Sequence, residues 1–192
     1  MESIVSAIEQ AELKTIYTSS RFLDNLKNRG VDLSSLSDMV NMVMLEDLRS
    51  EISPWEKVST MITCKLFSAS HLRKKFCASP DLESTAVILF SSGSEGPPKG
   101  VMLSHKNILA NVKQVSKILN ADSDDVIMAN LPIFHSFGMT ACLFLSMLER
   151  IKMVCHIDPT DVVANAKAIR QHKATLLFGT SSFFRLYIKN KK

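Results

Sequence analysis

Apolar residues recur along the chain with two different periods, and segments of the two kinds alternate. Helical spacing is found at residues 2–12, 21–30, 55–76, 105–120, 136–149, 158–172 and 181–189. Short apolar runs typical of buried strands lie between them, at residues 14–19, 40–45, 86–92, 101–103, 125–130, 151–157 and 175–180. Strands that alternate with helices of about 10–15 residues predict an α/β fold with a largely parallel sheet flanked by helices.

Local signals set several of the expected boundaries. Gly30 predicts the end of helix 21–30, and Pro54 after Ser53 predicts the start of the longest helix. Ser104 is a good N-cap for the helix that follows it. Residues 31–38 are predicted to form a loop, and residues 45–52 a turn.

A stretch of 23 residues, 126–148, contains no Asp, Glu, Lys or Arg. A helix that spans a bilayer needs about 20 predominantly apolar residues. Polar residues and a proline gather in the first half of this stretch, and the continuous apolar part is only about ten residues long. We therefore expect a buried strand, a loop and a buried helix, and no transmembrane segment.

Composition narrows the class of protein. The chain has 192 residues, of which 46% are hydrophobic and 22% charged, as in a globular domain. Its formal net charge of +4 gives no argument for nucleic acid. The basic cluster His71–Lys75 is interpreted as a solvated helix face, with an anionic partner as the alternative. The four cysteines have no metal-ligand spacing and are predicted to be reduced, mostly core thiols. The acidic N-terminus does not resemble a secretion signal.

The stretch FSSGSEGPPKG, residues 90–100, offers candidate chemistry. A polyphosphate site needs converging backbone N–H groups, which glycine permits, together with hydroxyl donors and a cation. The loop supplies all three, and the strand before it would place it where α/β sheets bind ligands. It does not fit the common P-loop, because Gly100 follows Lys99 where Ser or Thr should stand. Composition alone leaves a Gly- and Pro-rich turn as an equal alternative.

As a longer string, ILFSSGSEGPPKGVMLSHKNI resembles the phosphate-binding signature of the adenylate-forming superfamily, which includes acyl-CoA synthetases, peptide-synthetase adenylation domains and luciferases. The segments NLPIFHSFG (130–138) and LLFGTSSFF (176–184) are also similar to segments of fatty-acyl members. Together these segments look most like the acyl-acyl-carrier-protein synthetase half of bacterial bifunctional 2-acylglycerophosphoethanolamine acyltransferases. The resemblance covers essentially the whole chain.

The resemblance implies a fold, an extent and a set of parts. Residues 1–192 would be a fragment of the large N-terminal AMP-binding domain. Residues 1–77 would be a first α/β lobe segment, and 85–192 a segment with the phosphate loop and acyl pocket. The family's ribose-binding aspartate, hinge and small lysine-bearing domain are not found, so we expect the chain to be inactive alone. The resemblance implies that the parent protein is cytoplasmic, with the inner face of the bacterial inner membrane as its site of action.

The reaction implied by the resemblance uses ATP and Mg²⁺. A fatty acid would be activated as an acyl-adenylate and passed to acyl carrier protein or coenzyme A. The predicted nucleotide-binding residues are Ser91, Ser92, Gly93, Ser94, Glu95, Gly96, Lys99 and Gly100. Glu95 stands where many members have Thr, so its role beside a triphosphate is in doubt. No metal ligand is predicted.

The resemblance also implies substrate-binding residues. His135 would lie near the carboxylate as a catalytic and substrate-binding residue, with a core histidine as the alternative. Gly138 would allow close approach either of the acyl chain or of a packed helix. Gly179, Thr180 and Ser181 would border the acyl and adenylate pocket, or simply cap the last helix. The apolar residues Phe137, Met139, Leu143 and Phe144 are predicted to be core rather than acyl tunnel. Alternatives for the whole chain are a phosphate-binding module without chemistry and a structural domain.

Overall fold

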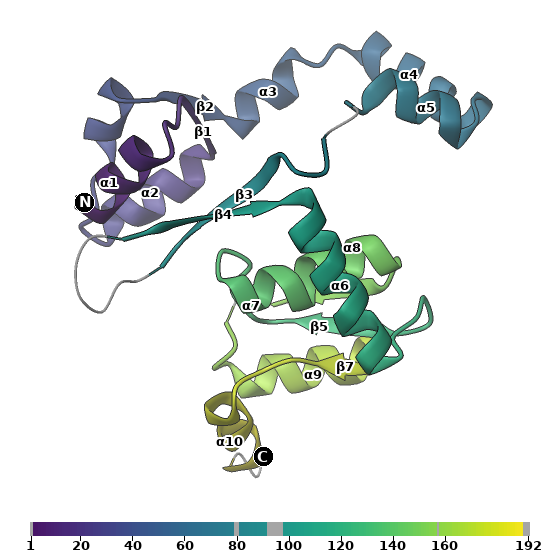
Figure 1. The fold of residues 1–192 in the computed structure, drawn as a ribbon. Helices are drawn as coiled ribbons and strands as arrows, with labels where there is room; N and C mark the ends of the chain where they lie inside the picture. Colours follow the sequence, from purple (N-terminus) through teal and green to yellow (C-terminus); the bar gives the residue numbers. More distant parts are fainter. Residues whose placement is uncertain (1, 79–80, 92–97, 157, 190–192) are drawn as a thin grey trace. The chain divides into compact units, whose positions relative to one another are not determined.

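The computed structural model describes residues 2–78, 81–91, 98–156 and 158–189 (Figure 1). The chain divides into two compact units, which are described separately. The first comprises Met1–Pro80 and Phe90–Val101, and the second comprises Asp81–Leu89 and Met102–Lys192. The domain boundaries proposed from the sequence stay a prediction.

The first unit begins with two short parallel strands and the helices around them. Its elements are α1 (Glu2–Gln10), β1 (Thr15–Thr18), α2 (Ser20–Asn28), the 3-10 helix η1 (Ser34–Asp38), β2 (Asn41–Met44), α3 (Leu45–Glu51), α4 (Pro54–Leu66) and α5 (Ala69–Phe76). β1 and β2 pair in parallel, with Thr15 opposite Asn41. A small core of Ile8, Leu36 and Val40 forms beside them, so this unit buries few side chains completely.

Residues at its ends fix the position of α2. The Ser19 side chain accepts a hydrogen bond from the Phe22 amide, which satisfies one of the helix's free N–H groups. After the helix, the Gly30 amide donates to Lys27 O and the Val31 amide to Leu26 O. Gly30 has φ +79°, a conformation that glycine adopts at little cost. The predicted end of this helix at Gly30 is confirmed.

Two predictions for the first unit are wrong. Residues 45–51 form the helix α3 rather than a turn. The helix predicted over 55–76 is two helices, because Phe67 is extended and the Ser68 hydroxyl accepts a hydrogen bond from the His71 amide. Ser68 therefore starts a new helix, as serine does at an N-cap.

The second unit is built on three parallel strands. Its elements are β3 (Thr85–Phe90) and β4 (Gly100–Ser104), which contribute residues to both units, then α6 (His105–Leu119), β5 (Val126–Ala129), α7 (Ser136–Gly138), the π-helix η2 (Met139–Phe144), α8 (Leu145–Glu149), β6 (Lys152–Cys155), α9 (Val162–His172), β7 (Leu176–Leu177) and α10 (Ser181–Lys189). The strand order is β6-β5-β7, and both pairings are parallel. The predicted α/β fold with a largely parallel sheet is confirmed.

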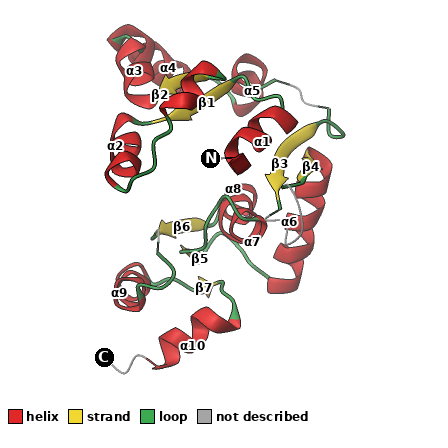
Figure 2. Cartoon of the chain, turned by 90° about the vertical axis from the view of Figure 1, so that its left-hand side faces the viewer, coloured by secondary structure: helices red, strands yellow, loops and turns green. Residues whose placement is uncertain are grey.

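Helices cover both faces of this sheet. η2 and α9 each pack on β5, and Figures 1 and 2 place them on opposite faces. α6 packs against η2 and α8. The buried core of this unit comprises Val112, Ile127, Ala129, Leu131, Cys142, Leu145 and Ile151. The β5 strand is therefore the centre of the unit.

The charge-free stretch folds as predicted, into a buried strand, a loop and a helical segment. Residues 136–149 are helical throughout, with the π-helix η2 in the middle. Among the residues described, no helix is long and apolar enough to cross a membrane. The last helix, 181–189, is confirmed, whereas the strand predicted at 175–180 is reduced to Leu176–Leu177.

The prediction for the cysteines is half right. All four are free thiols, but only Cys142 is buried; Cys64, Cys77 and Cys155 are exposed. Cys64 lies on α4, which buries none of its residues, so an apolar neighbourhood in the sequence does not become a core there. Burial raises the pKa of the Cys142 thiol.

A threonine joins the starts of β5 and β7. The Thr175 hydroxyl donates to Asp125 Oδ1 at 2.7 Å and accepts from the Val126 amide at 2.9 Å. The Thr175 hydroxyl, together with the Asp122 amide, holds the pKa of Asp125 below its usual value. A carboxyl whose pKa is lower in the folded state stabilises the fold above its unfolded pKa, about 3.9, and this stability is lost as the pH falls through the folded pKa.

We expect Thr175→Val to raise the pKa of Asp125 and to reduce the loss of stability on acidification below about pH 4. The pKa is measured by carboxyl NMR titration, and stability by urea unfolding at neutral and acid pH. Thr60→Val, at an exposed threonine, is the control. An unchanged Asp125 titration in Thr175→Val would show that the hydroxyl is not the cause.

Candidate active site

The predicted phosphate loop joins β3 to β4. The Ser91 amide donates to Lys99 O at 3.0 Å, and the His105 amide donates to Ser84 O at the other end of the pair. The two strands are therefore antiparallel, and the loop closes between Ser91 and Lys99. The side chain of Gln10 on α1 donates to Pro98 O at 2.9 Å. This bond ties the segment before β4 to α1 within the first unit.

Three of the predicted nucleotide-binding residues are described: Ser91 and Lys99 are exposed at the base of the loop, and Gly100 begins β4. Ser92, Gly93, Ser94, Glu95 and Gly96 lie outside the described residues. Lys99 makes no recorded ion pair within the described part of the chain.

A capping box fixes the helix that follows the hairpin. The Ser104 hydroxyl accepts from the Asn107 amide at 3.2 Å, and Asn107 Oδ1 accepts from the Ser104 amide at 3.0 Å. The two backbone amides, of Ser104 and Asn107, would otherwise be free donors at the first turn of α6. The predicted N-cap at Ser104 is confirmed, and it turns the chain directly from β4 into α6.

His135 is exposed and precedes α7. Its Nδ1 accepts a hydrogen bond from the Phe137 amide at 3.3 Å, and its carbonyl accepts from the Met139 amide. A neutral imidazole with Nδ1 as acceptor carries its proton on Nε2. His135 is therefore not a core histidine: it caps the helix with one nitrogen and leaves an N–H donor on the other.

Gly138 is buried where the loop from β5 crosses the start of the helical segment. A Cβ at this position would lie 2.2 Å from Pro132 O and 2.8 Å from Pro132 C. Real Cβ atoms do not approach a backbone so closely, so only glycine fits. Close packing against the backbone of Pro132 therefore explains why glycine stands at position 138, which was one of the two alternatives. Contact of Gly138 with an acyl chain stays a prediction.

A groove with a volume of about 400 Å³ lies within the second unit. It is lined by Asn111, Val115, Ile118, Leu119, Ser136, Phe137, Thr140, Ala141 and Phe178. Most of these side chains are apolar, and they come from α6, the start of the helical segment and the residue after β7. The volume falls in the range of small-molecule pockets.

The groove is lined in part by residues next to the two predicted substrate-binding segments. Ser136 and Phe137 follow His135, and Phe178 precedes Gly179. The Gly179 backbone faces the Phe184 ring, which a Cβ would meet at 3.3 Å. Thr180 and Ser181 are exposed at the start of α10, and Thr180 O accepts from the Phe184 amide. Residues 179–181 thus form the turn into α10, and Phe178, which lines the groove, comes directly before them.

The structure corrects the interpretation of Phe137. Met139 is buried, and Phe144 packs against the core, as predicted for these residues. Phe137 instead is exposed and lines the groove. Helical spacing could not indicate this exposure, because the π-helix η2 changes which side chains share a face with Phe137.

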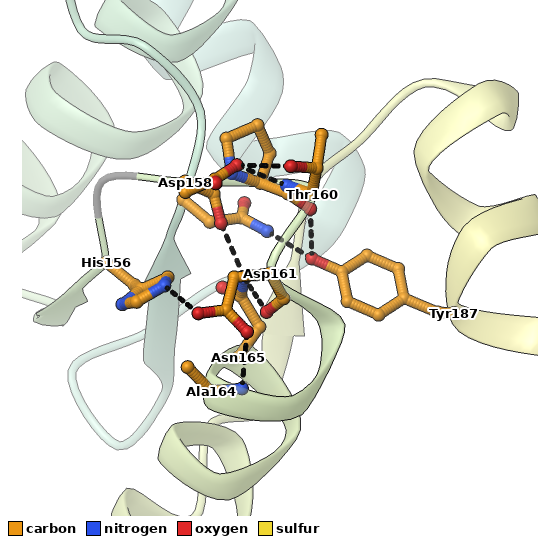
Figure 3. A network of polar contacts seen from close by, with 9 residues as sticks. His156, Asp158, Thr160, Asp161, Ala164, Asn165 and Tyr187 are labelled. Carbon is orange, nitrogen blue, oxygen red and sulfur yellow. Dashed lines mark hydrogen bonds and ion pairs between the residues drawn. The ribbon is translucent and has the colours of Figure 1, made fainter. Parts of the chain in front are cut away.

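A polar network joins the end of β5 to α9 and α10 (Figure 3). Buried Asn130 donates to the Tyr187 hydroxyl at 2.8 Å, and this hydroxyl donates to Pro159 O at 2.9 Å. Buried Asn165 donates to the carbonyls of Asp158 and Asp161 at 2.8 and 2.7 Å. The network holds α10, and hence the turn at 179–181, against the segment before α9. Sequence reasoning missed it, because an asparagine in an apolar helix indicates no partner by itself.

Asp158 is fixed by the same turn. Its Oδ1 accepts from the Thr160 hydroxyl at 2.6 Å and from the Thr160 amide at 2.8 Å, and these bonds lower the pKa of the Asp158 carboxyl. The helix expected to begin at 158–160 begins at Val162, because the Asp161 side chain caps it by accepting from the Ala164 amide. Burial raises the pKa of the Tyr187 phenol.

The comparison with known families decides the classification. The family model described as AMP-binding enzyme matches residues 2–192. The chain belongs to the AMP-binding enzyme family. This result confirms the resemblance at the level of the superfamily, and it places both the hairpin loop and the groove within a single family domain.

Individual relatives of this member of the AMP-binding enzyme family are acyl ligases. Long chain acyl-CoA synthetase 8 of Arabidopsis thaliana is 31% identical over 147 residues, which are 73% of this chain and 20% of the relative. A chloroplastic long-chain-fatty-acid–[acyl-carrier-protein] ligase of the same plant is 38% identical over 65 residues, 34% of this chain and 9% of the relative. The chain spans about a fifth to a third of the length of the first curated relatives it matches.

Solved structures agree on the fold of this family member. o-Succinylbenzoate CoA synthetase from Bacillus subtilis, in complex with AMP, has a TM-score of 0.74 at 17% identity, covering 100% of this chain and 42% of that one. The same synthetase in complex with ATP and magnesium has a TM-score of 0.72. The expected α/β fold of the N-terminal domain of adenylate-forming enzymes is therefore confirmed.

Proposed function

We propose that this chain supplies the phosphate loop and the acyl groove of an ATP-dependent ligase that joins a fatty acid to a thiol. The observation that carries the proposal is the apolar groove, whose lining includes Ser136, the residue after His135, and Phe178, the residue before Gly179. The family match and the acyl ligases among the relatives support it.

The proposed reaction has two steps. A carboxylate oxygen of the fatty acid attacks the α-phosphorus of ATP, the bond to the β-phosphate oxygen breaks, and pyrophosphate leaves. The thiolate of the acceptor then attacks the acyl carbon of the adenylate, and AMP leaves with the electron pair of the acyl–oxygen bond. Both steps depend mainly on positioning and on stabilising developing negative charge.

In this proposal the hairpin between β3 and β4 holds the triphosphate. The backbone bond from Ser91 to Lys99 fixes the base of the loop, and we propose that the exposed Lys99 ammonium binds the β- and γ-phosphates. Among the described residues, no cluster of three or more His, Cys, Asp or Glu could hold a metal ion. Mg²⁺ commonly binds through substrate phosphates and few protein ligands, so it fits this site as a companion of the nucleotide.

In this proposal, the tautomer of His135 with its hydrogen on Nε2 suits a role at the carboxylate of the fatty acid. Because its Nδ1 accepts from the Phe137 amide, its Nε2 carries the hydrogen and can donate to a carboxylate or acyl oxygen. We propose that this donor orients the fatty acid at the mouth of the groove. The helix cap thereby fixes the tautomer that the reaction needs.

The groove takes the acyl chain in this proposal. The apolar surface is provided by Phe178 after β7 and, on α6, by Val115, Ile118 and Leu119. Phe137, two residues after His135, also lines the groove. η2 contributes Thr140 and Ala141, and π-helices within α-helices are frequent at functional sites. Each methylene buried there stabilises the complex by about 0.8 kcal/mol.

We propose acyl carrier protein as the acceptor, with coenzyme A as the alternative. The 38% identity to an acyl-carrier-protein ligase and the sequence resemblance support this choice. The same resemblance supports a role in phospholipid metabolism, an attached acyltransferase in the parent protein, and a cytoplasmic location at the inner face of the bacterial inner membrane. Acceptor choice is tested by competing the two thiols in the parent enzyme.

Two exposed isoleucines provide a matched test of the groove. Ile118 on the groove wall is 81% exposed, and Ile188 on α10, outside it, is 79% exposed. We expect Ile118→Glu to weaken fatty-acid binding at least ten-fold, because it places a carboxylate beside the apolar chain, whereas Ile188→Glu has little effect. Displacement of a fluorescent fatty acid measures both. Equal affinities of the two variants would contradict the acyl groove without touching the nucleotide site.

A further inference from the structure

The helices α4 and α5 of the first unit bury none of their residues. α4 nevertheless carries an apolar stripe with helical spacing: Trp55, Val58, Ile62 and Leu66. All four are exposed, and Trp55 and Leu66 are exposed by 81% and 76%. Such a stripe faces a core in an ordinary surface helix, so its exposure here indicates an apolar partner.

Positive charge is concentrated in the same segment. Residues 53–76 contain one acid, Glu56, and the bases Lys57, Lys65, Arg73, Lys74 and Lys75. Their net charge of +4 equals that of the whole chain, so acids and bases balance in the remaining residues. The net charge of this protein is therefore concentrated in the segment that carries the exposed apolar stripe.

Aromatic residues at the junction lie among these bases. The Phe67 ring stacks on His71 with ring centroids 4.4 Å apart, and the Lys75 ammonium lies 5.5 Å from the centroid of the Phe76 ring. Phe67 and Phe76 are themselves exposed. Trp, Phe and Leu beside Lys and Arg are typical of helices that lie in the interface of a bilayer.

We propose that residues 53–76, the α4–α5 surface, dock on a bilayer that contains anionic phospholipid. The apolar stripe enters the boundary between headgroups and acyl chains, and the bases of α5 meet the negative headgroups. Charge complementarity selects this occupant: a second copy of the chain would bring +4 against +4, and an apolar protein surface would leave the bases unpaired. This inference is independent of the proposed ligase function.

Trp55 provides the measurement, because it is the single tryptophan of the chain. We expect its fluorescence to shift to the blue when vesicles of phosphatidylcholine with phosphatidylglycerol are added, and to change little with phosphatidylcholine alone. Added salt weakens the binding, since it screens the headgroups. Each base near an anionic surface contributes about five-fold in affinity. Arg73→Gln, Lys74→Gln and Lys75→Gln together are therefore expected to lower affinity by about 100-fold.

Matched variants separate the α4–α5 surface from general effects. Leu66→Glu should abolish the shift, whereas Val163→Glu, at an exposed valine on α9, should not. Replacement of Lys152, Lys167 and Arg170 by Gln removes the same charge elsewhere and should leave affinity unchanged. Co-sedimentation with the vesicles checks each result independently. An unchanged spectrum with anionic vesicles, an equal response to both lipids, or a blue shift that depends only on protein concentration would overturn the proposal.

Discussion

Gly138→Ala is expected to destabilise the second unit by about 3 kcal/mol, although alanine is the better helix former. The new Cβ would meet the carbonyl of Pro132 at 2.2 Å, and this neighbour is backbone rather than the end of a flexible side chain. Either the loop from β5 or the start of the helical segment must shift. The shift would displace His135 and Phe137, so fatty-acid binding should fall with stability.

Gly30→Ala is the control for this prediction. Position 30 also favours glycine, but the reason there is its φ of +79°. No atom lies within 4 Å of a Cβ at this position. Its substitution should cost about 1 kcal/mol, from backbone strain alone. Urea unfolding of both variants measures the difference. Equal losses of stability would show that the contact with Pro132 yields without cost.

Lys99→Ala is expected to weaken Mg·ATP binding by about ten- to a hundred-fold, the effect of losing a charge-assisted hydrogen bond to phosphate. The Lys99 carbonyl accepts the bond from the Ser91 amide, and a substitution of the side chain leaves this backbone bond in place. The loop should therefore keep its base and lose only its cation. Lys99→Arg should retain part of the affinity, because charge is kept while the geometry changes.

Calorimetric titration with Mg·ATP measures this effect, and Lys152→Ala is the control for loss of an exposed lysine. A matching decrease in Lys152→Ala would indicate nonspecific attraction of the nucleotide. Undiminished binding in Lys99→Ala would remove this lysine from the phosphate site, while the acyl groove, which is tested separately by Ile118→Glu, would be unaffected.

Local chemistry explains which elements could be predicted from the sequence. Ser104 and Gly30 mark helix ends through bonds within a few residues, so their signals are complete in the sequence. The alternation of helices and strands likewise predicts the parallel pairing of β5 with its neighbours. Ser68 follows the same capping rule, but its signal was outweighed by the long apolar spacing of 55–76.

Features that depend on tertiary packing could not be predicted. Ile118 lines the groove because α6 packs on η2, and nothing in its immediate neighbours indicates Phe178 as a partner. The network from Asn130 through Tyr187 to Pro159 links residues that are distant in the sequence. His135 was predicted from a resemblance, while its tautomer follows only from the hydrogen bond of Phe137.

The most direct test of the central claim is the binding of a non-hydrolysable acyl-adenylate mimic, a 5′-O-(N-acylsulfamoyl)adenosine, to this chain. We predict that a long-chain mimic binds more tightly than AMP or the free fatty acid. Its affinity should rise with the length of its acyl chain. We also predict that Lys99→Ala leaves this binding largely intact, since the mimic lacks the β- and γ-phosphates, whereas Ile118→Glu weakens it. Affinity that is independent of the acyl chain, or absent altogether, would contradict the proposal that the groove of this chain holds the acyl part of an acyl-adenylate.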